Sequence, residues 1–359
     1  MKRPFDYITY GASCNSEEVQ RMLRFLLEPT FRGERAEPPA PLCIWGRHGI
    51  GKTRIVRDLA REMGAKFAYL APAQFEEMGD LTGMPQVEGG VTRFAPPDWA
   101  PREEGPGILL IDDVNRADDR ILRGLMQLLQ NYELVSWRIP PRWHIVLTAN
   151  PDGGDYSVTP MDDAILTRMM HVTLEWDACA WARWADREGV DPRGIAFVAA
   201  HPELADGSRT TPRTLVQFFQ EISSIPDLST ALPLVRLLAE GCLDEDTTAA
   251  FLAFVRTGLQ GTVEPEEILG AASFEGLEGR LNRLDMLSLA VSRLLAHLEK
   301  GKNWTPAQLD NLERFLLLDF IPADVRFRLA QSLANSRHPE LRSVAGRPAV
   351  GKFLLEALK

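Results

Sequence analysis

The sequence predicts an α/β fold in which helices cover both faces of a parallel sheet, followed by an all-helical region. Three observations support this prediction. Short apolar runs alternate with helix-forming segments between residues 42 and 175. A glycine-rich loop motif follows the first apolar run, and strand-like runs cease after residue 174. A sheet of this kind carries its ligand at the carboxyl ends of its strands.

The composition is that of an ordinary globular protein with two or three domains. The chain has 359 residues, of which 45% are hydrophobic and 25% charged. No apolar run approaches the ~20 residues that span a bilayer, so we expect a cytoplasmic protein with no membrane partner. Forty basic residues against fifty acidic ones give a net charge of −10, which disfavours a nucleic-acid partner. The four cysteines show no C-x-x-C pairing and suggest neither a zinc site nor a disulfide framework.

Residues 1–40 are predicted to be an N-terminal helical segment. Apolar residues recur at helical spacing over Ser16–Glu28, and a proline-rich stretch ends at Pro41. The first strand follows directly. The five predicted strands of the sheet are Leu42–Trp45, Lys66–Leu70, Gly107–Ile111, His144–Ala149 and Met169–Leu174.

The first strand leads into the sequence Gly46-Arg47-His48-Gly49-Ile50-Gly51-Lys52-Thr53, which has the form G-x-x-x-x-G-K-T. Its glycines allow successive backbone N–H groups to point at a polyphosphate, and the following helix begins at the anion. Lys52 is expected to reach the β- and γ-phosphates, and the Thr53 hydroxyl to bind Mg²⁺. The predicted nucleotide-binding residues are Gly46, Gly49, Ile50, Gly51, Lys52, Thr53 and Arg54.

Two further strands end in polar residues. Asp112 and Asp113 follow Gly107–Ile111, and Asn150 follows His144–Ala149. At the ligand edge of a parallel sheet, Asp112 is placed to hold Mg²⁺ and Asp113 to polarise the attacking water. The Asn150 amide is placed to hold that water or a γ-phosphate oxygen. The alternatives are a solvated acidic turn and an ordinary Asn-Pro turn.

These blocks resemble, in order and spacing, the MoxR-type AAA+ ATPases over about residues 40–225. The matching blocks are Gly46–Thr53, Ile108–Ala117, Leu147–Pro151, Tyr156–Arg168 and Thr211–Arg213. The resemblance implies an ATP- and Mg²⁺-dependent ATPase with Walker A at Lys52 and Thr53. It also implies a helix-2 insertion over Gly79–Trp99 and a hairpin before sensor 1 over Glu133–Arg142.

The same resemblance assigns the remaining site residues. Asp112 and Asp113 become Walker B, Asn150 sensor 1, Arg168 the arginine finger and Arg213 sensor 2. Arg168 also has a physical basis, because its position before the last strand suits a guanidinium donated to a neighbouring subunit. A surface arginine paired with a nearby aspartate is the alternative for Arg168, and Arg116 is a second candidate for the interface.

The pattern of elements along the chain predicts four parts: the segment 1–40, an α/β P-loop AAA+ domain over 41–175, an α-helical lid over 176–262 and a helical extension over 263–359. In the lid, Pro212 opens a helix that is expected to run to Ile225. Later helices are expected at about 228–240, 244–258, 283–300, 305–318 and 322–335.

The resemblance implies a homo-oligomeric ring, expected to be a hexamer, that remodels a protein client with a von Willebrand factor A domain. One departure matters, because the family usually has Glu where this chain has the shorter Asp113. A positioning error of about 1 Å can cost ~10²-fold in rate, so hydrolysis is expected to be slow. A nucleic-acid motor and a slow ATP switch in a static assembly remain the alternatives.

Overall fold

The computed structural model describes residues 8–34, 40–151, 158–258, 263–281, 287, 290–291, 293–295, 297–298 and 303–357. The chain divides into two compact units, Met1–Trp181 and Ala182–Lys359. The finer division into four parts, with boundaries after residues 40, 175 and 262, stays a prediction.

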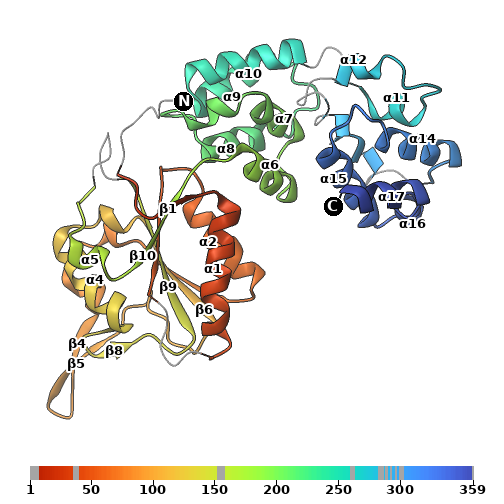
Figure 1. Cartoon of the computed structure of the whole chain (residues 1–359). Coiled ribbons are helices and arrows are strands. Elements are labelled where there is room, and N and C mark those ends of the chain that lie inside the picture. Colours follow the sequence, from red (N-terminus) through yellow and green to blue (C-terminus); the bar gives the residue numbers. More distant parts are fainter. Residues whose placement is uncertain are drawn as a thin grey trace. The chain divides into compact units, whose positions relative to one another are not determined.

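The first unit is built on a six-stranded sheet in which every strand pair is parallel (Figure 1). The strand order is β1-β10-β2-β9-β6-β3. This arrangement confirms the predicted parallel sheet sandwiched by helices. The strands are β1 (Ala12–Cys14), β2 (Leu42–Trp45), β3 (Lys66–Leu70), β6 (Gly107–Ile111), β9 (Trp143–Ala149) and β10 (Met170–Leu174).

The sheet has one strand more than the five predicted. The additional strand, β1, pairs with the edge of β10 and lies in the segment 1–40, which was expected to contain only a helix. Its three residues are exposed or half-buried, so no apolar run marks it in the sequence. Asn15 then caps the next helix by accepting from the N–H groups of Glu17 and Glu18.

Helices cover both faces of this sheet (Figure 1). Side chains of alternate strand residues pack on opposite faces, because a strand has a side-chain period of two. On one face, Ile44 and Leu110 pack with helices α1 (Ser16–Phe31) and α2 (Lys52–Glu62). On the other face, Leu109 and Leu147 pack with helices α4 (Asp119–Asn131) and α5 (Asp163–Leu166).

Two small hairpins lie next to each other in the first unit. Strands β4 (Met84–Glu88) and β5 (Val91–Ala95) follow helix α3 (Met78–Thr82), and strands β7 (Glu133–Leu134) and β8 (Trp137–Arg138) precede β9. The backbone N–H of Phe94 donates to Ser136 Oγ at 3.0 Å, and the rings of Trp99 and Trp137 meet edge to face with centroids 5.5 Å apart. Short 3₁₀ turns occupy Pro72–Gln74 and Val114–Arg116.

The described part of the second unit is helical. Helix α6 (Ala178–Arg187) crosses the boundary between the units. Phenylalanine rings form a buried cluster in which Phe218 and Phe251 meet edge to face with centroids 4.8 Å apart. The helices of this region are α7 (Pro192–Ala200), α8 (Pro212–Ile222), α9 (Leu232–Cys242) and α10 (Glu245–Gly258), with a 3₁₀ turn at Pro202–Asp206.

The C-terminal helices of the second unit share a separate cluster of buried leucine, valine and phenylalanine side chains. Much of the helix predicted at 283–300 lies outside the described residues. The helices with stated bounds are α11 (Pro265–Leu269), α12 (Leu277–Leu281), α14 (Pro306–Leu316), α15 (Ala323–Ala334), α16 (Pro339–Ala345) and α17 (Pro348–Ala357).

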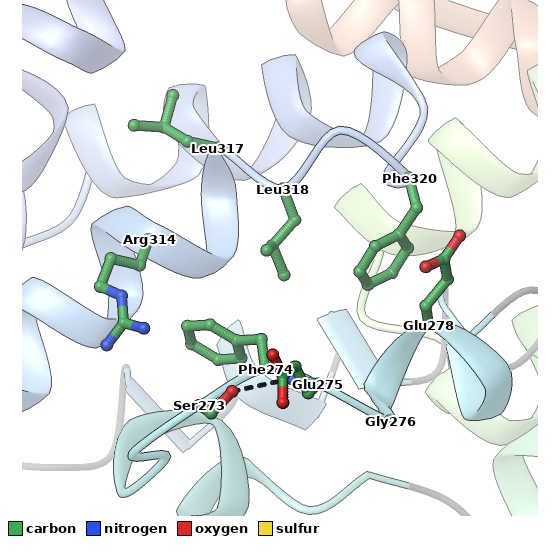
Figure 2. Close-up of a pocket in the computed structure, with 9 residues that line it drawn as sticks. All are labelled: Ser273, Phe274, Glu275, Gly276, Glu278, Arg314, Leu317, Leu318 and Phe320. Carbon is green, nitrogen blue, oxygen red and sulfur yellow. Dashed lines mark hydrogen bonds between the residues drawn. The ribbon is translucent and has the colours of Figure 1, made fainter.

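A surface hollow of about 630 Å³ lies among these C-terminal helices. Figure 2 shows Phe274, Leu318 and Phe320 around it, with Arg314 at one side. None of the predicted site residues lines this hollow. Across the described residues, no helix is both long enough and apolar enough to cross a bilayer.

Candidate functional site

The predicted site residues of the first unit gather where three neighbouring strands end. Strands β2, β9 and β6 lie side by side, with Trp45 in register with Ala149 and Ile111 in register with Leu147. The loop after β2, Asn150 after β9 and Asp112 after β6 therefore meet at one edge of the sheet.

The loop after β2 has glycines in the left-handed backbone region and leads directly into a helix. Gly49 has φ 73° and Gly51 has φ 105°, values that side-chain-bearing residues rarely adopt. Gly51 is also the N-terminal cap of α2, so the helix begins at Lys52. Lys52 is 5% exposed, and its Nζ donates to the carbonyls of Gly46 at 2.6 Å and Arg47 at 3.0 Å.

Thr53 and Asp112, the two predicted magnesium ligands, are in direct contact. Thr53 Oγ1 donates to Asp112 Oδ1 at 2.7 Å. Thr148 Oγ1 donates to the same oxygen at 2.6 Å and itself accepts from the backbone N–H of Asp113 at 2.8 Å. A hydroxyl and a carboxylate are hard oxygen ligands of the kind that Mg²⁺ takes, so these side chains fit the predicted ion.

Asn150 connects the lysine with the second aspartate. Its Oδ1 accepts from Lys52 Nζ at 3.2 Å, and its Nδ2 donates to Asp113 Oδ1 at 3.0 Å. Its backbone N–H donates to Asn115 Oδ1 at 3.0 Å, and its carbonyl accepts from Asn115 Nδ2 at 2.8 Å. Asn115 and Asn150 are both fully buried, so these bonds fix the amide between the loop and Asp113.

Asp113 has an unusual backbone conformation. Its φ of 49° and ψ of 46° lie in the left-handed region, which aspartate tolerates better than most residues. Residues held in sparsely populated backbone conformations occur preferentially at functional sites. Arg116 Nε lies 3.4 Å from Asp113 Oδ2, and both side chains are partly exposed. The carboxylate therefore lies between Asn150 and Arg116 and stays partly open to solvent.

Tyr69 contacts the site from the neighbouring strand β3. Its hydroxyl donates to Asp112 Oδ2 at 3.0 Å, and the residue is 42% exposed. Partial burial, together with the negative charge of Asp112, raises the pKa of Tyr69 to about 12. The phenol therefore remains a protonated donor at neutral pH.

Arg168 lies at the opposite end of the sheet from the phosphate loop. It precedes β10, and the first residue of that strand pairs with Leu42 at the start of β2. The five residues of β10 span about 16 Å at ~3.3 Å per residue. Within its own chain, Arg168 Nε donates to Gln130 Oε1 at 3.1 Å and its Nη1 donates to the carbonyl of Ala164. This placement keeps Arg168 away from the loop after β2 of its own chain.

The other predicted site residues lie outside this cluster or beside it. Arg213 is an exposed residue in the first turn of α8, in the second unit, so its reach toward the nucleotide stays a prediction. Arg54 Nε donates to both carboxylate oxygens of Asp58 at 2.9 Å, four residues along α2. Ile50 packs partly buried against the cluster that includes Ile44. Nucleotide contacts for Arg54 and Ile50 stay predictions as well.

Three residues of the cluster were not predicted from the sequence: Tyr69, Asn115 and Thr148. Asn115 and Thr148 are fully buried polar residues, and both lie inside the motif blocks that carry the predicted site. A polar residue within an apolar strand, as at Thr148, was the available signal. Tyr69 carried no such signal, because its contact depends on the pairing of β3 with β6.

Residues 41–169 match the sequence model of a family described as AAA domain, dynein-related subfamily. This segment is an AAA domain of that subfamily, and it contains the phosphate loop, Asp112, Asp113, Asn150 and Arg168. The family match begins one residue before β2 and ends one residue before β10, and it leaves the second unit outside.

Two curated relatives match this chain over segments somewhat shorter than the family match. The ATP-dependent zinc metalloprotease FtsH of Nitrosococcus oceani is 32% identical over 113 residues, which are 30% of this chain and 17% of that protein. An ATP-dependent protease ATP-binding subunit-like protein of Rhodococcus erythropolis is 33% identical over 107 residues, 27% of this chain and 30% of that protein. The chain thus spans less than a third of the length of either relative.

Solved structures give weaker likenesses. The RuvB Holliday junction branch migration motor of Thermotoga maritima has a TM-score of 0.39 and 14% identity, covering 81% of this chain and 90% of that one. Hsp104 with ATPγS and FITC casein has a TM-score of 0.43 and 14% identity, covering 61% of this chain and 46% of that one.

Proposed function

We propose that this chain is a Mg²⁺-dependent ATPase of the MoxR type that acts as a homo-oligomeric ring, a hexamer, and remodels a partner protein. The observation that carries the proposal is the continuous set of contacts from Lys52 through Asn150 to Asp113, beside the Thr53 and Asp112 pair. The AAA domain match over residues 41–169 and the ATP-dependent relatives support ATP as the nucleotide.

Each side chain of the cluster has a role in this reaction. Lys52 and the N–H groups of the loop bind the β- and γ-phosphates, while Thr53 and Asp112 would hold Mg²⁺. When bound, the ion neutralises charge that develops on the phosphate oxygens. Asp113 orients and polarises the attacking water, and the Asn150 amide positions the γ-phosphate or that water.

Completion of the site is proposed to require a second subunit. Arg168 lies about 16 Å along the sheet from the phosphate loop of its own chain, by the length of β10. A guanidinium at that distance cannot touch its own γ-phosphate, whereas it could reach the nucleotide of a neighbour. Arg213 in the lid would act as sensor 2, and the ring would be located in the cytoplasm.

A protein partner is favoured by the surface of the two hairpins. Met84, Val87 and Val91 on β4–β5 are 70%, 77% and 59% exposed, and Val135 between β7 and β8 is 53% exposed. Such side chains can bury apolar area against a protein partner, although by strand alternation Val87 lies on the opposite face of its hairpin from Met84 and Val91. The segment 76–102 around the first hairpin carries five carboxylates and two arginines, which is unfavourable for binding a nucleic-acid strand. The MoxR resemblance adds a von Willebrand factor A domain to the expected partner.

A slow ATP switch is the second candidate, and the length of the side chain at position 113 favours it. Asp113 is one methylene shorter than Glu, and it already accepts from Asn150 while lying 3.4 Å from Arg116. A carboxylate held by these neighbours has less freedom to reach a water. Steady-state phosphate release in the presence and absence of a partner separates a switch from a remodeller.

The ATP-binding step is tested with Lys52→Ala and a fluorescent ATP analogue. We expect affinity to fall at least tenfold while the protein stays folded, because the loop N–H groups remain while the cation is lost. Lys66→Ala is the matched control, since Lys66 forms a surface ion pair with Glu103 at 2.6 Å and should leave affinity unchanged. Equal affinities for the two variants would overturn the phosphate-loop assignment.

The remodelling step is tested with a variant that is expected to stay bound to ATP and to its partner protein. Asp113→Asn is expected to bind ATP without hydrolysing it and so to retain its partner, whereas Lys52→Ala should not. Proteins that are recovered with Asp113→Asn but not with Lys52→Ala identify the partner. Recovery of nucleic acid in place of protein would favour the motor over the remodeller.

A further inference from the structure

The carboxylate of Asp112 is held from two sides by hydroxyl groups of the sheet. Thr148, from β9, donates to Oδ1 at 2.6 Å, and Tyr69, from β3, donates to Oδ2 at 3.0 Å. Both strands are direct neighbours of β6, which carries Asp112 at its end. The terminal torsion of an aspartate is broad, so bonds to both oxygens are what fix the carboxylate plane.

The fixed carboxylate determines the orientation of the Thr53 hydroxyl. Thr53 Oγ1 donates its proton to Asp112 Oδ1 at 2.7 Å. Since that proton is committed to the carboxylate, the lone pairs of Thr53 Oγ1 face away from Asp112 and would be available to a cation. A rotated carboxylate would turn this hydroxyl with it.

We propose that Tyr69 is a positioning residue of the Mg²⁺ site, whose hydroxyl holds the Asp112 carboxylate in the plane that presents Thr53 to the ion. This inference rests on the proposed ATPase function, because it deepens the role of Thr53 and Asp112. Hydrogen-bonding partners of metal ligands commonly change metal affinity when they are removed, by roughly 10–100-fold. Tyr69 acts through Asp112 and need not touch the nucleotide.

If Tyr69 had only a structural role, removing its hydroxyl would lower folding stability and leave the metal dependence of nucleotide binding unchanged. Tyr69 is 42% exposed and lies on the edge strand β3, so its hydroxyl contributes little to core packing. Removing it with Tyr69→Phe keeps the ring and deletes a single hydrogen bond. We therefore expect metal dependence, rather than folding stability, to respond.

The experiment measures binding of a fluorescent ATP analogue as MgCl₂ is titrated, and again in EDTA. Tyr69→Phe should raise the Mg²⁺ concentration for half-maximal enhancement about tenfold, with the same affinity in EDTA and the same melting temperature. The matched control is Tyr132→Phe. The Tyr132 hydroxyl accepts from the N–H of Ile145 at 3.2 Å and is buried away from Asp112, so this variant should lower the melting temperature without moving the Mg²⁺ midpoint.

A third variant separates the failure of this inference from the failure of the proposed function. Asp112→Asn should move the Mg²⁺ midpoint further than Tyr69→Phe does, because it removes the charge itself. If Asp112→Asn moves the midpoint and Tyr69→Phe does not, the role of Tyr69 is overturned and the Mg²⁺ site stands. If neither variant moves it, the Mg²⁺ site of the proposed function is overturned as well.

Discussion

Replacement of Asn115 by alanine should destabilise the first unit strongly, although Asn115 contacts no proposed ligand. Its side-chain amide accepts from the N–H of Asn150 at 3.0 Å and donates to the carbonyl of Asn150 at 2.8 Å. Both residues are 0% exposed, so Asn115→Ala leaves two backbone polar groups buried without these partners. Each such group costs about 1–3 kcal/mol, so the loss of both partners should cost about 2–6 kcal/mol.

Urea unfolding measures this loss. The relevant transition is the one that moves to higher urea when ATP and Mg²⁺ are added, because a ligand stabilises the unit that binds it. With a denaturant slope of about 3 kcal/mol per molar for a unit of this size, the midpoint should fall by about 0.7–2 M. Asn131→Ala is the matched control, since Asn131 is exposed at the end of α4, and it should change stability by less than ~0.5 kcal/mol.

A second variant, Asn150→Ala, separates an effect on turnover from an effect on stability. That variant removes the amide that joins Lys52 to Asp113, but its backbone groups keep their bonds to Asn115. We expect Asn150→Ala to lower turnover about 10²-fold or more with a smaller shift of the urea midpoint than Asn115→Ala. Coincident urea midpoints for Asn115→Ala and Asn131→Ala would refute the reasoning that these two bonds stabilise the site.

Three further predictions concern turnover. Asp113→Glu should raise phosphate release ~10- to 100-fold by restoring the reach of the carboxylate, and Asp113→Asn should nearly abolish it; equal rates would exclude Asp113 as the group that activates water. Arg168→Ala should lower turnover by 10³-fold or more with little change in ATP affinity. Mixed rings of Arg168→Ala and Lys52→Ala should regain activity, and no recovery after verified subunit exchange would count against a finger supplied by the neighbour. Single- or double-stranded DNA at low salt should leave turnover unchanged, and a several-fold, salt-sensitive stimulation would favour the nucleic-acid motor.

The buried strands could be read from the sequence with little error. The predicted bounds of β2, β3 and β6 agree with the structure residue by residue, and those of β9 and β10 differ by one residue at the start. β2, β6 and β9 are buried on both faces, which produces continuous apolar runs flanked by turn residues. The edge strand β1 could not be read, since its hydrogen bonds to β10 involve backbone groups that every residue has.

The site residues also differ in whether the sequence alone could predict them. Lys52, Thr53, Asp112 and Asn150 were predictable because each directly follows an apolar strand or lies in the loop motif. The contact of Tyr69 with Asp112 joins residues 43 positions apart and depends on which strands are neighbours, which a strand list does not specify. The reach of Arg213, which belongs to the second unit, depends on the relative placement of the two units, and sequence patterns do not specify that placement.

The bonds around Thr148 imply that ion binding and water activation can be altered separately. Thr148 Oγ1 accepts from the backbone N–H of Asp113, not from its side chain, and donates to Asp112 Oδ1. A change of side chain at position 113 therefore leaves the support of Asp112 in place, provided that the backbone keeps its left-handed conformation. Because of this arrangement, Asp113→Glu and Asp113→Asn should retain the wild-type Mg²⁺ midpoint for nucleotide binding while their rates diverge. A midpoint that shifts together with the rate would mean that the two carboxylates act as one unit, so slow turnover could not be attributed to the length of Asp113 alone.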